Sequence, residues 1–162
     1  MSVVATSKYL AFTLGGELFA VDITSAREIL DFCEITRIPH MPSFIRGVVN
    51  LRGNAVTVVD LKQQFGMGRT ERTILTRIII LELPQDKHPL LIGVLADSVK
   101  EVLELEESQI EPPPLMGAQV RSDFLKGVAR HKGGFLLLLD EHKVFAPEEL
   151  ERVRLAAPPA PR

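Results

Sequence analysis

The chain has 162 residues, of which 46% are hydrophobic and 25% charged, and its formal net charge is −2. This length suits one domain or two small domains that share an interface, and the scattered basic residues create no field that would attract nucleic acid. The single cysteine, Cys33, excludes an internal disulfide and a cysteine-based metal site.

The same sequence predicts where the protein resides. Its first residues lack the basic and then apolar plan of a secretion signal, and no apolar run approaches the roughly 20 residues that cross a bilayer. A lone thiol fits a reducing compartment. We therefore expect a cytoplasmic protein without direct membrane insertion.

Short strands dominate the predicted secondary structure. Apolar and β-branched runs, separated by turn residues every eight to twelve positions, are typical of small β-barrels or sandwiches. In chain order we expect strands at 9–14, 17–21, 47–51, 55–60, 76–83, 90–95, 127–130 and 135–139. Three-residue turns are expected at Arg52-Gly53-Asn54 and Lys132-Gly133-Gly134.

A few helical segments interrupt the strands. Short helical turns are expected at 61–65 and 141–145, and a C-terminal helix that packs on the barrels is expected at 147–156, where acids come early and arginines late. Residues 157–162 are predicted to be a disordered tail. Ser25-x-x-Glu28 and Ser98-x-x-Glu101 match a capping box, but the segments are short, and we favour a turn that leads into a strand.

The sequence also contains an internal repeat. Residues 44–61 recur at 124–141, and residues 18–30 recur more weakly at 91–103. The identical pairs in the stronger block are Phe44/Phe124, Gly47/Gly127, Val48/Val128, Gly53/Gly133 and Asp60/Asp140. We therefore predict an all-β protein of two similar barrel units, one at 8–72 and the other at 73–146.

The residues that could carry catalysis or bind a metal form no recognisable site. The four histidines show no metal-ligand spacing. Asp60 and Asp140 occupy equivalent positions after apolar strands and before short helices, where an aspartate usually caps backbone N–H groups. No nucleophile, base and oxyanion site come together, so we expect no enzymatic activity, no metal and no cofactor.

The segment Gly47-Val48-Val49-Asn50-Leu51-Arg52-Gly53, followed by Val58-Val59-Asp60-Leu61, resembles the CheW family of bacterial chemotaxis coupling proteins. The resemblance extends over residues 8–146. It implies two five-stranded SH3-like barrels with short connecting helices, in agreement with the repeat. It also implies an adaptor between the regulatory domain of a CheA-type histidine kinase and the cytoplasmic hairpin of chemoreceptors (methyl-accepting proteins), recruited to membrane-associated receptor arrays.

The resemblance implies roles for individual residues. Glu28, Arg52, Val99 and Val102 match receptor-binding positions, and Glu28 and Arg52 are expected to pair on the surface. Leu10 and Ala26 match kinase-binding positions, although the family more often has Val or Ile in place of Ala26. Four glycines, Gly47, Gly53, Gly127 and Gly133, are expected to serve turn geometry.

Alternative interpretations remain at this point. Glu28 could instead cap a helical turn, and the apolar candidates could instead belong to the core. The protein could be a CheW-like scaffold of a non-swimming chemosensory pathway that controls surface motility or a second messenger. A small-ligand barrel that uses the cleft between the units, with Asp60, Asp140 or His131, is the third possibility.

Overall fold

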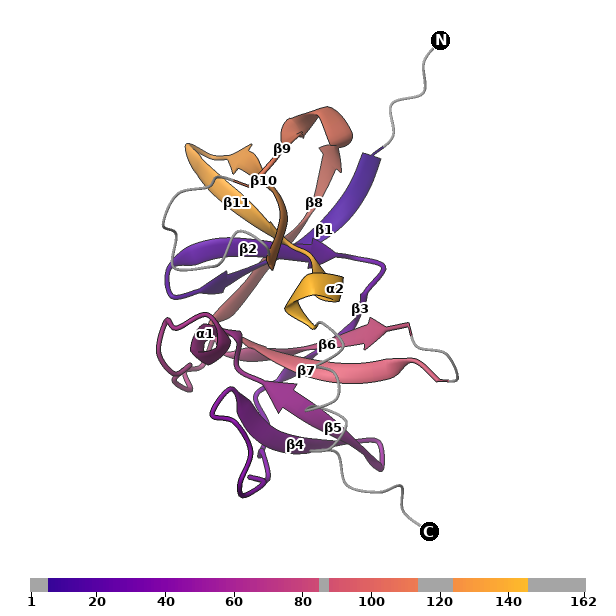
Figure 1. Cartoon of the computed structure of the whole chain (residues 1–162), viewed down its shortest axis with the longest axis vertical. Coiled ribbons are helices and arrows are strands. Elements are labelled where there is room, and N and C mark those ends of the chain that lie inside the picture. The colour runs from indigo at the N-terminus through magenta and orange to yellow at the C-terminus, as the bar shows by residue number, and fades with distance from the viewer. Residues whose placement is uncertain (1–5, 85–87, 114–123, 146–162) are drawn as a thin grey trace.

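The computed structural model describes residues 6–84, 88–113 and 124–145, and this part of the chain is mostly β-structure, as predicted (Figure 1). The strands are β1 (Thr6–Leu14), β2 (Glu17–Asp22), β3 (Ala26–Asp31), β4 (Ile45–Leu51), β5 (Asn54–Val59), β6 (Arg77–Leu83), β7 (Leu90–Ala96), β8 (Ser98–Glu106), β9 (Ile110–Glu111), β10 (Leu125–His131) and β11 (Gly134–Leu139). Two short helices, α1 (Leu61–Gln64) and α2 (Glu141–Val144), and a 3₁₀ turn at Glu107–Gln109 join them. The predicted helix at 147–156 and tail at 157–162 lie outside the described residues.

The strands form two sheets that curve around separate interiors. One sheet has the order β8-β1-β2-β11-β10-β9 and the other the order β3-β6-β7-β5-β4. We call them barrel A and barrel B, and they lie one above the other in Figure 1. Each barrel contains one parallel pair, β2 with β11 and β5 with β7, at equivalent places. The internal repeat is therefore a repeat of structure as well as of sequence.

The predicted division of the chain at 8–72 and 73–146 is wrong, because the two repeats exchange their first hairpins. β1 and β2 pair with β8 and β11 of the second repeat, whereas β6 and β7 pair with β3 and β5 of the first. Only residues 23–25 join β2 to β3, and only Asp97 joins β7 to β8. Neither link closes a hairpin, since β2 does not pair with β3 and β7 does not pair with β8, and at each link the chain crosses to the other barrel. All strands of barrel B thus come from one continuous segment of the chain, whereas barrel A is built from the segments before and after it.

Alternation along β1 explains how the barrels hold together. Tyr9 and Ala11 face the interior of barrel A, whereas Leu10, Phe12 and Leu14 belong to a core between the barrels. The equivalent strand β6 divides in the same way, with Ile78 and Ile80 inside barrel B and Ile79, Leu81 and Leu83 between the barrels. Because both faces of these strands are buried, their sequences are continuous apolar runs. Each buried leucine or isoleucine contributes about 1.5–3 kcal/mol, so separating the barrels would be costly.

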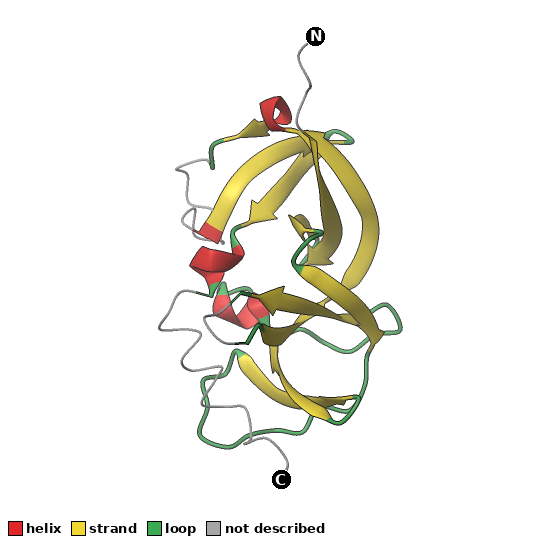
Figure 2. Ribbon diagram, turned by 90° about the vertical axis from the view of Figure 1, so that its right-hand side faces the viewer, coloured by secondary structure: helices red, strands yellow, loops and turns green. Residues whose placement is uncertain are grey.

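The two helices lie close together on one side of the molecule, where the barrels meet (Figure 2). Asp60 caps α1 by accepting the Lys62 N–H at 3.2 Å, and Asp140 caps α2 by accepting the His142 N–H at 3.0 Å. The predicted capping role of both aspartates is confirmed. Gln64 Nε2 donates to the carbonyl oxygen of Val144 at 3.0 Å and so links the helices directly. Among the residues that the structure describes, no helix is long and apolar enough to cross a membrane.

The hairpin turns at Gly53 and Gly133 are shorter than predicted. Asn54 pairs with Leu51, and Gly134 pairs with His131, so each loop has two residues and not three. The loop residues all have positive φ, namely 51° at Arg52, 86° at Gly53, 46° at Lys132 and 79° at Gly133. Such turns match the right-handed twist of the flanking strands. The turn role predicted for Gly53 and Gly133 is confirmed.

Gly47 and Gly127 have a different role from the predicted one, since both lie inside strands. The strand register shifts just before each of them, between Ile45 and Gly47 in β4 and between Leu125 and Gly127 in β10. A Cβ at Gly47 would overlap the carbonyl oxygen of Thr36, and a Cβ at Gly127 would lie 2.8 Å from the carbonyl oxygen of Glu111. Glycine is required at these two positions because another backbone segment approaches closely.

Candidate functional site

The pair of Glu28 and Arg52 lies on the surface of barrel B. Glu28 is on β3, Arg52 is in the β4–β5 turn, and Arg52 Nη2 donates to Glu28 Oε2 at 2.8 Å and to Oε1 at 3.2 Å. The predicted pairing is confirmed, and the capping alternative for Glu28 is wrong because β3 is a strand. The Arg52 side chain is 72% exposed. An exposed pair of this kind contributes only about 0–1 kcal/mol, but it fixes the direction of the guanidinium.

Barrel A carries an equivalent pair that sequence reasoning did not identify. Lys132 Nζ lies 3.4 Å from Glu101 Oε1, and His131 Nε2 lies 3.5 Å from the same oxygen. The internal repeat could have predicted this pair, because Glu101 is equivalent to Glu28 and Lys132 is equivalent to Arg52. The second pair is longer and uses an ammonium group, which lacks the planar fork of arginine. The two hairpin turns thus present related but unequal charged groups.

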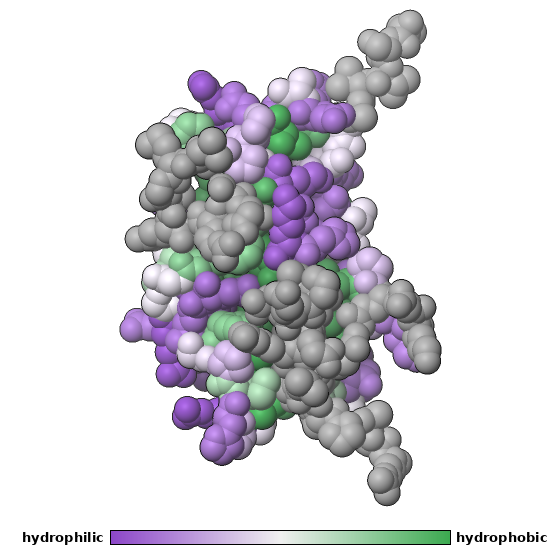
Figure 3. Space-filling model, viewed as in Figure 1, coloured by the Kyte–Doolittle hydropathy of each residue, from purple (hydrophilic) through white to green (hydrophobic). Residues whose placement is uncertain are grey.

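Exposed aliphatic side chains adjoin both acidic residues. Ile29 follows Glu28 and is 43% exposed, and Val102 follows Glu101 and is 50% exposed. Val99, by contrast, is partly buried against the core between the barrels. Of the two predicted valines, Val102 therefore has the open surface, and Ile29 is an exposed apolar residue that the sequence reasoning missed. Among the described residues visible in Figure 3, hydrophobic patches lie between polar ones.

The two residues predicted to contact a kinase lie at the core between the barrels. Leu10 is only 4% exposed, and Ala26 is partly buried against the same core. Little of the Leu10 side chain is therefore open to a partner, and its kinase contact stays a prediction. Leu10 faces Val102 across the β1–β8 ladder. Its position is that of a support for the strand that presents Val102.

Asp60, one of the candidate acids, is fully buried, and both of its carboxylate oxygens accept hydrogen bonds. Its carboxylate accepts from Arg46 Nη1 at 3.0 Å and from the Thr70 N–H at 2.9 Å and hydroxyl at 2.7 Å, besides the helix cap. A buried carboxylate with this many donors is a structural anchor.

Among the described residues, Asp140 accepts only the helix-capping hydrogen bond from the His142 N–H and has no such network. Lys126, the repeat partner of Arg46, donates to the Tyr9 hydroxyl at 3.3 Å. Burial lowers the pKa of Lys126, but the hydrogen bond to Tyr9 and the negative charges of Asp22 and Glu141 raise it more, so its pKa is raised overall. Arg46 thus pairs with Asp60, whereas Lys126 bonds to Tyr9, and the two candidate acids have different hydrogen-bond partners.

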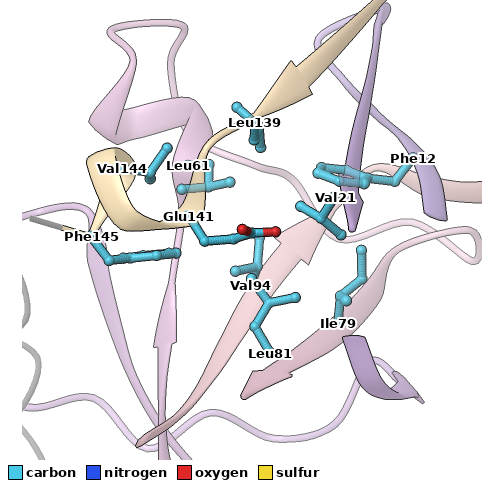
Figure 4. Close-up of a pocket in the computed structure, with 10 residues that line it drawn as sticks. All are labelled: Phe12, Val21, Leu61, Ile79, Leu81, Val94, Leu139, Glu141, Val144 and Phe145. Carbon is cyan, nitrogen blue, oxygen red and sulfur yellow. The ribbon is translucent and has the colours of Figure 1, made fainter. Parts of the chain in front are cut away.

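A small apolar cavity lies at the junction of the barrels and α2 (Figure 4). Its free volume of about 10 Å³ has room for roughly one water, and neither Asp60, Asp140 nor His131 lines it. Among the described residues, this cavity is therefore too small for the ligand that the small-ligand interpretation requires. The polar group in its wall is Glu141, whose side chain points toward the surrounding apolar side chains and whose pKa is raised by burial.

Metal-ligating residues are not clustered in residues 6–84, 88–113 and 124–145, since no three His, Cys, Asp or Glu side chains there are placed to share an ion. Across the described chain the most distinctive polar groups are the two charged turns. The arrangement is one of exposed, fixed charges beside aliphatic side chains, which is suited to recognition of another protein.

Comparison with known proteins gives a consistent result. The model of the CheW-like domain matches residues 8–149. The chemotaxis protein CheW of Klebsiella aerogenes is 34% identical over 149 residues, covering 90% of this chain and 86% of that protein. CheW of Rhizobium meliloti is 32% identical over 142 residues, covering 88% and 89%.

A solved structure agrees with the sequence matches. The crystal structure of the scaffolding protein TtCheW from Thermoanaerobacter tengcongensis superposes with a TM-score of 0.78 at 32% identity and covers 92% of each chain. The match extends through both barrels, and the predicted fold of two SH3-like barrels is confirmed.

Proposed function

The chain belongs to the CheW-like family of chemotaxis scaffolds, and on that premise we propose that it is a non-enzymatic adaptor. It couples the cytoplasmic hairpin of a chemoreceptor to the regulatory domain of a CheA-type histidine kinase. It works in the cytoplasm and is recruited to membrane-associated receptor arrays. Neither partner interaction involves a cofactor or a metal.

The observation that carries the proposal is the Glu28–Arg52 pair. A carboxylate held 2.8 Å from one guanidinium nitrogen directs an arginine that is otherwise open to solvent. Fixed charge sets the register of a bound helix, while apolar side chains supply its affinity. Val102 is exposed and accessible for such a contact. Glu28, Arg52 and Val102 are therefore the proposed receptor-binding residues, with Val99 supporting them from a partly buried position.

The kinase contact is proposed at the strand that begins with Ala26. Ala26 starts β3 and packs partly against the core between the barrels, next to the short link from barrel A. A small side chain there reduces the apolar area available to a partner, so backbone and neighbouring side chains of β3 share the contact. Leu10 contributes from below the surface by fixing β1.

Two small interfaces on one adaptor explain how signals would pass. Each interface is of the order of 1,200 Å² or less, which corresponds to modest affinity, and repeated copies in an array strengthen the assembly. Receptor state then changes kinase activity through differential contacts at two linked sites. No covalent modification of the adaptor is needed.

Reconstitution of receptor-dependent kinase control tests the proposal. The assay combines a receptor cytoplasmic fragment, a CheA-type kinase and either the wild-type protein or Arg52→Ala. We expect Arg52→Ala to reduce receptor-dependent control several-fold while its free energy of unfolding changes by about 1 kcal/mol or less. Lys132→Ala is the matched control, because it removes a cation from the equivalent turn of barrel A. Normal coupling by Arg52→Ala would contradict the assignment.

A chemosensory pathway for surface motility or second-messenger control would use the same surfaces. Co-purification separates the two cases when the baits, a CheA regulatory domain and a receptor tip fragment, are taken from each chemosensory system of the source organism. Retention by the baits of the swimming system alone supports the coupling function proposed here, whereas retention by those of another system alone supports the other pathway.

A further inference from the structure

A hollow on barrel B is lined mainly by the loop between β3 and β4. Its volume is about 190 Å³, and its walls also include residues of α1 and of the segment that follows α1. The charged and polar side chains that line it are Arg37, His40, Ser43, Arg46, Gln63 and Arg69. None of these residues belongs to the receptor or kinase surfaces proposed above.

Arg46 forms one wall of this hollow, and its hydrogen bonds hold it in place beside an opposite charge. Arg46 Nη1 donates to Asp60 Oδ2 and to the carbonyl oxygen of Thr70, both at 3.0 Å, and only 14% of the Arg46 side chain is exposed. Asp60 lies behind it and does not line the hollow. The positive charge of Arg46 is therefore matched by Asp60 and adds nothing to the net charge of the site.

The other two arginines are not matched. Within residues 6–84, 88–113 and 124–145, Arg37 and Arg69 have no hydrogen bond or ion pair, and no aspartate or glutamate lines the hollow. Most other arginines in this part of the chain do have a partner: Arg27 with Glu82, Arg52 with Glu28, Arg77 with Asp31, and Arg72 over the Phe32 ring. Arg37 and Arg69 are both exposed, and they place two unpaired guanidinium groups at one hollow.

We propose that this hollow binds the phosphate group of a small molecule. Two uncompensated arginines match a phosphate that carries about −1.5 to −2 charges at neutral pH, whereas a carboxylate would leave one arginine unpaired. The planar fork of a guanidinium binds two phosphate oxygens at once. The volume exceeds the space that a phosphate group needs, so the rest of a small ester fits beside Pro39 and Met41.

An NMR titration in phosphate-free buffer tests the site. Inorganic phosphate and glycerol phosphate are added separately to the full chain at constant ionic strength, with acetate as the monoanion control. We expect saturable shifts of the amide signals of the non-proline residues in 37–43 and of Arg69, and weaker effects from acetate. If glycerol phosphate binds at least as tightly as inorganic phosphate, the ligand is an ester, and if it binds more weakly, it is the free ion. Both results support the site.

Variants locate the binding. Arg37→Gln and Arg69→Gln should each weaken phosphate binding by about tenfold or more, since each loses a charge-assisted hydrogen bond. Arg130→Gln is the matched control, because Arg130 is exposed on β10 and has no partner among the described residues. Thermal melts check that all three variants remain folded. Shifts without saturation, equal binding of acetate, or an equal loss in Arg130→Gln would overturn the proposal.

Discussion

Glu141 occupies in the second repeat the position that Leu61 occupies in the first, and both side chains line the same apolar cavity between the barrels (Figure 4). Burial raises the pKa of the Glu141 carboxyl, and the negative charge of Asp22 adds to this effect, whereas backbone hydrogen bonds and His142 oppose it. Glu141 Oε1 also accepts the Asp22 N–H at 3.3 Å. A carboxyl group thus replaces a leucine at the junction of the two barrels.

This replacement predicts that stability depends on pH. Because the pKa of Glu141 is higher in the folded than in the unfolded protein, the residue favours folding in acid and loses this contribution as pH rises through the raised pKa. Glu141→Gln keeps the acceptor for Asp22 but removes the titration. We expect its free energy of unfolding to exceed that of the wild type by about 1 kcal/mol at pH 7 and the difference to shrink toward pH 4. Urea unfolding across this pH range provides the measurement, and parallel curves for both proteins would contradict it.

Gly47 should tolerate alanine less well than Gly53. An alanine at Gly53 meets no neighbouring atom and is disfavoured only by its positive φ, which costs about 1 kcal/mol. An alanine at Gly47 has a positive φ of 143° and also overlaps the carbonyl oxygen of Thr36, so we expect a loss of about 3 kcal/mol or more. Urea unfolding of Gly47→Ala and Gly53→Ala compares the two, and similar losses would show that β4 moves to make room.

Removing Arg46 should leave a buried charge without a partner. Asp60 is fully buried, and Arg46 is its ion-pair partner at 3.0 Å. We expect Arg46→Met to lower the free energy of unfolding by about 3 kcal/mol at pH 7. Lys126→Met, at the equivalent position of barrel A, should cost only about 1 kcal/mol because Lys126 hydrogen-bonds to the Tyr9 hydroxyl and not to a buried carboxylate. Equal losses in chemical denaturation would contradict the distinction.

Leu10 and Val102 face each other across β1 and β8 but should respond differently to truncation. Leu10→Ala removes a core side chain and should cost about 2–5 kcal/mol. Val102→Ala changes a half-exposed side chain and should cost about 0.5 kcal/mol or less while weakening receptor-fragment binding under the proposed function. Thermal unfolding and a pull-down with the receptor fragment separate these effects. A stable Leu10→Ala protein that fails to bind the kinase would instead support a surface role for Leu10.

Local sequence patterns were enough to predict much of this structure. The apolar runs of β1 and β6 predicted strands, and the aspartates before 61–65 and 141–145 predicted helix caps, because both depend on neighbouring residues alone. The Glu28–Arg52 pair followed from the family resemblance. The related pair at Glu101 and Lys132 could have been found by applying the repeat to that prediction.

Features that depend on distant parts of the chain were not predicted. The exchange of hairpins depends on which strand edges meet in space, and the repeat looks the same with or without it. For the same reason Gly47 looked like a turn glycine, although the need for it comes from Thr36 on a neighbouring segment. Burial of Leu10 and exposure of Ile29 likewise follow from how the barrels pack and not from residue type.

The exchanged hairpins determine the order in which the two barrels can be completed during synthesis on the ribosome. Every strand of barrel B lies within residues 26–96, so that barrel has all its parts early. Thr6 pairs with Glu106, and Leu18 pairs with Leu136, so the first hairpin keeps open edges until those much later residues have been translated. Unpaired edges of this kind invite association with other chains, which makes the nascent N-terminal hairpin the segment most in need of protection.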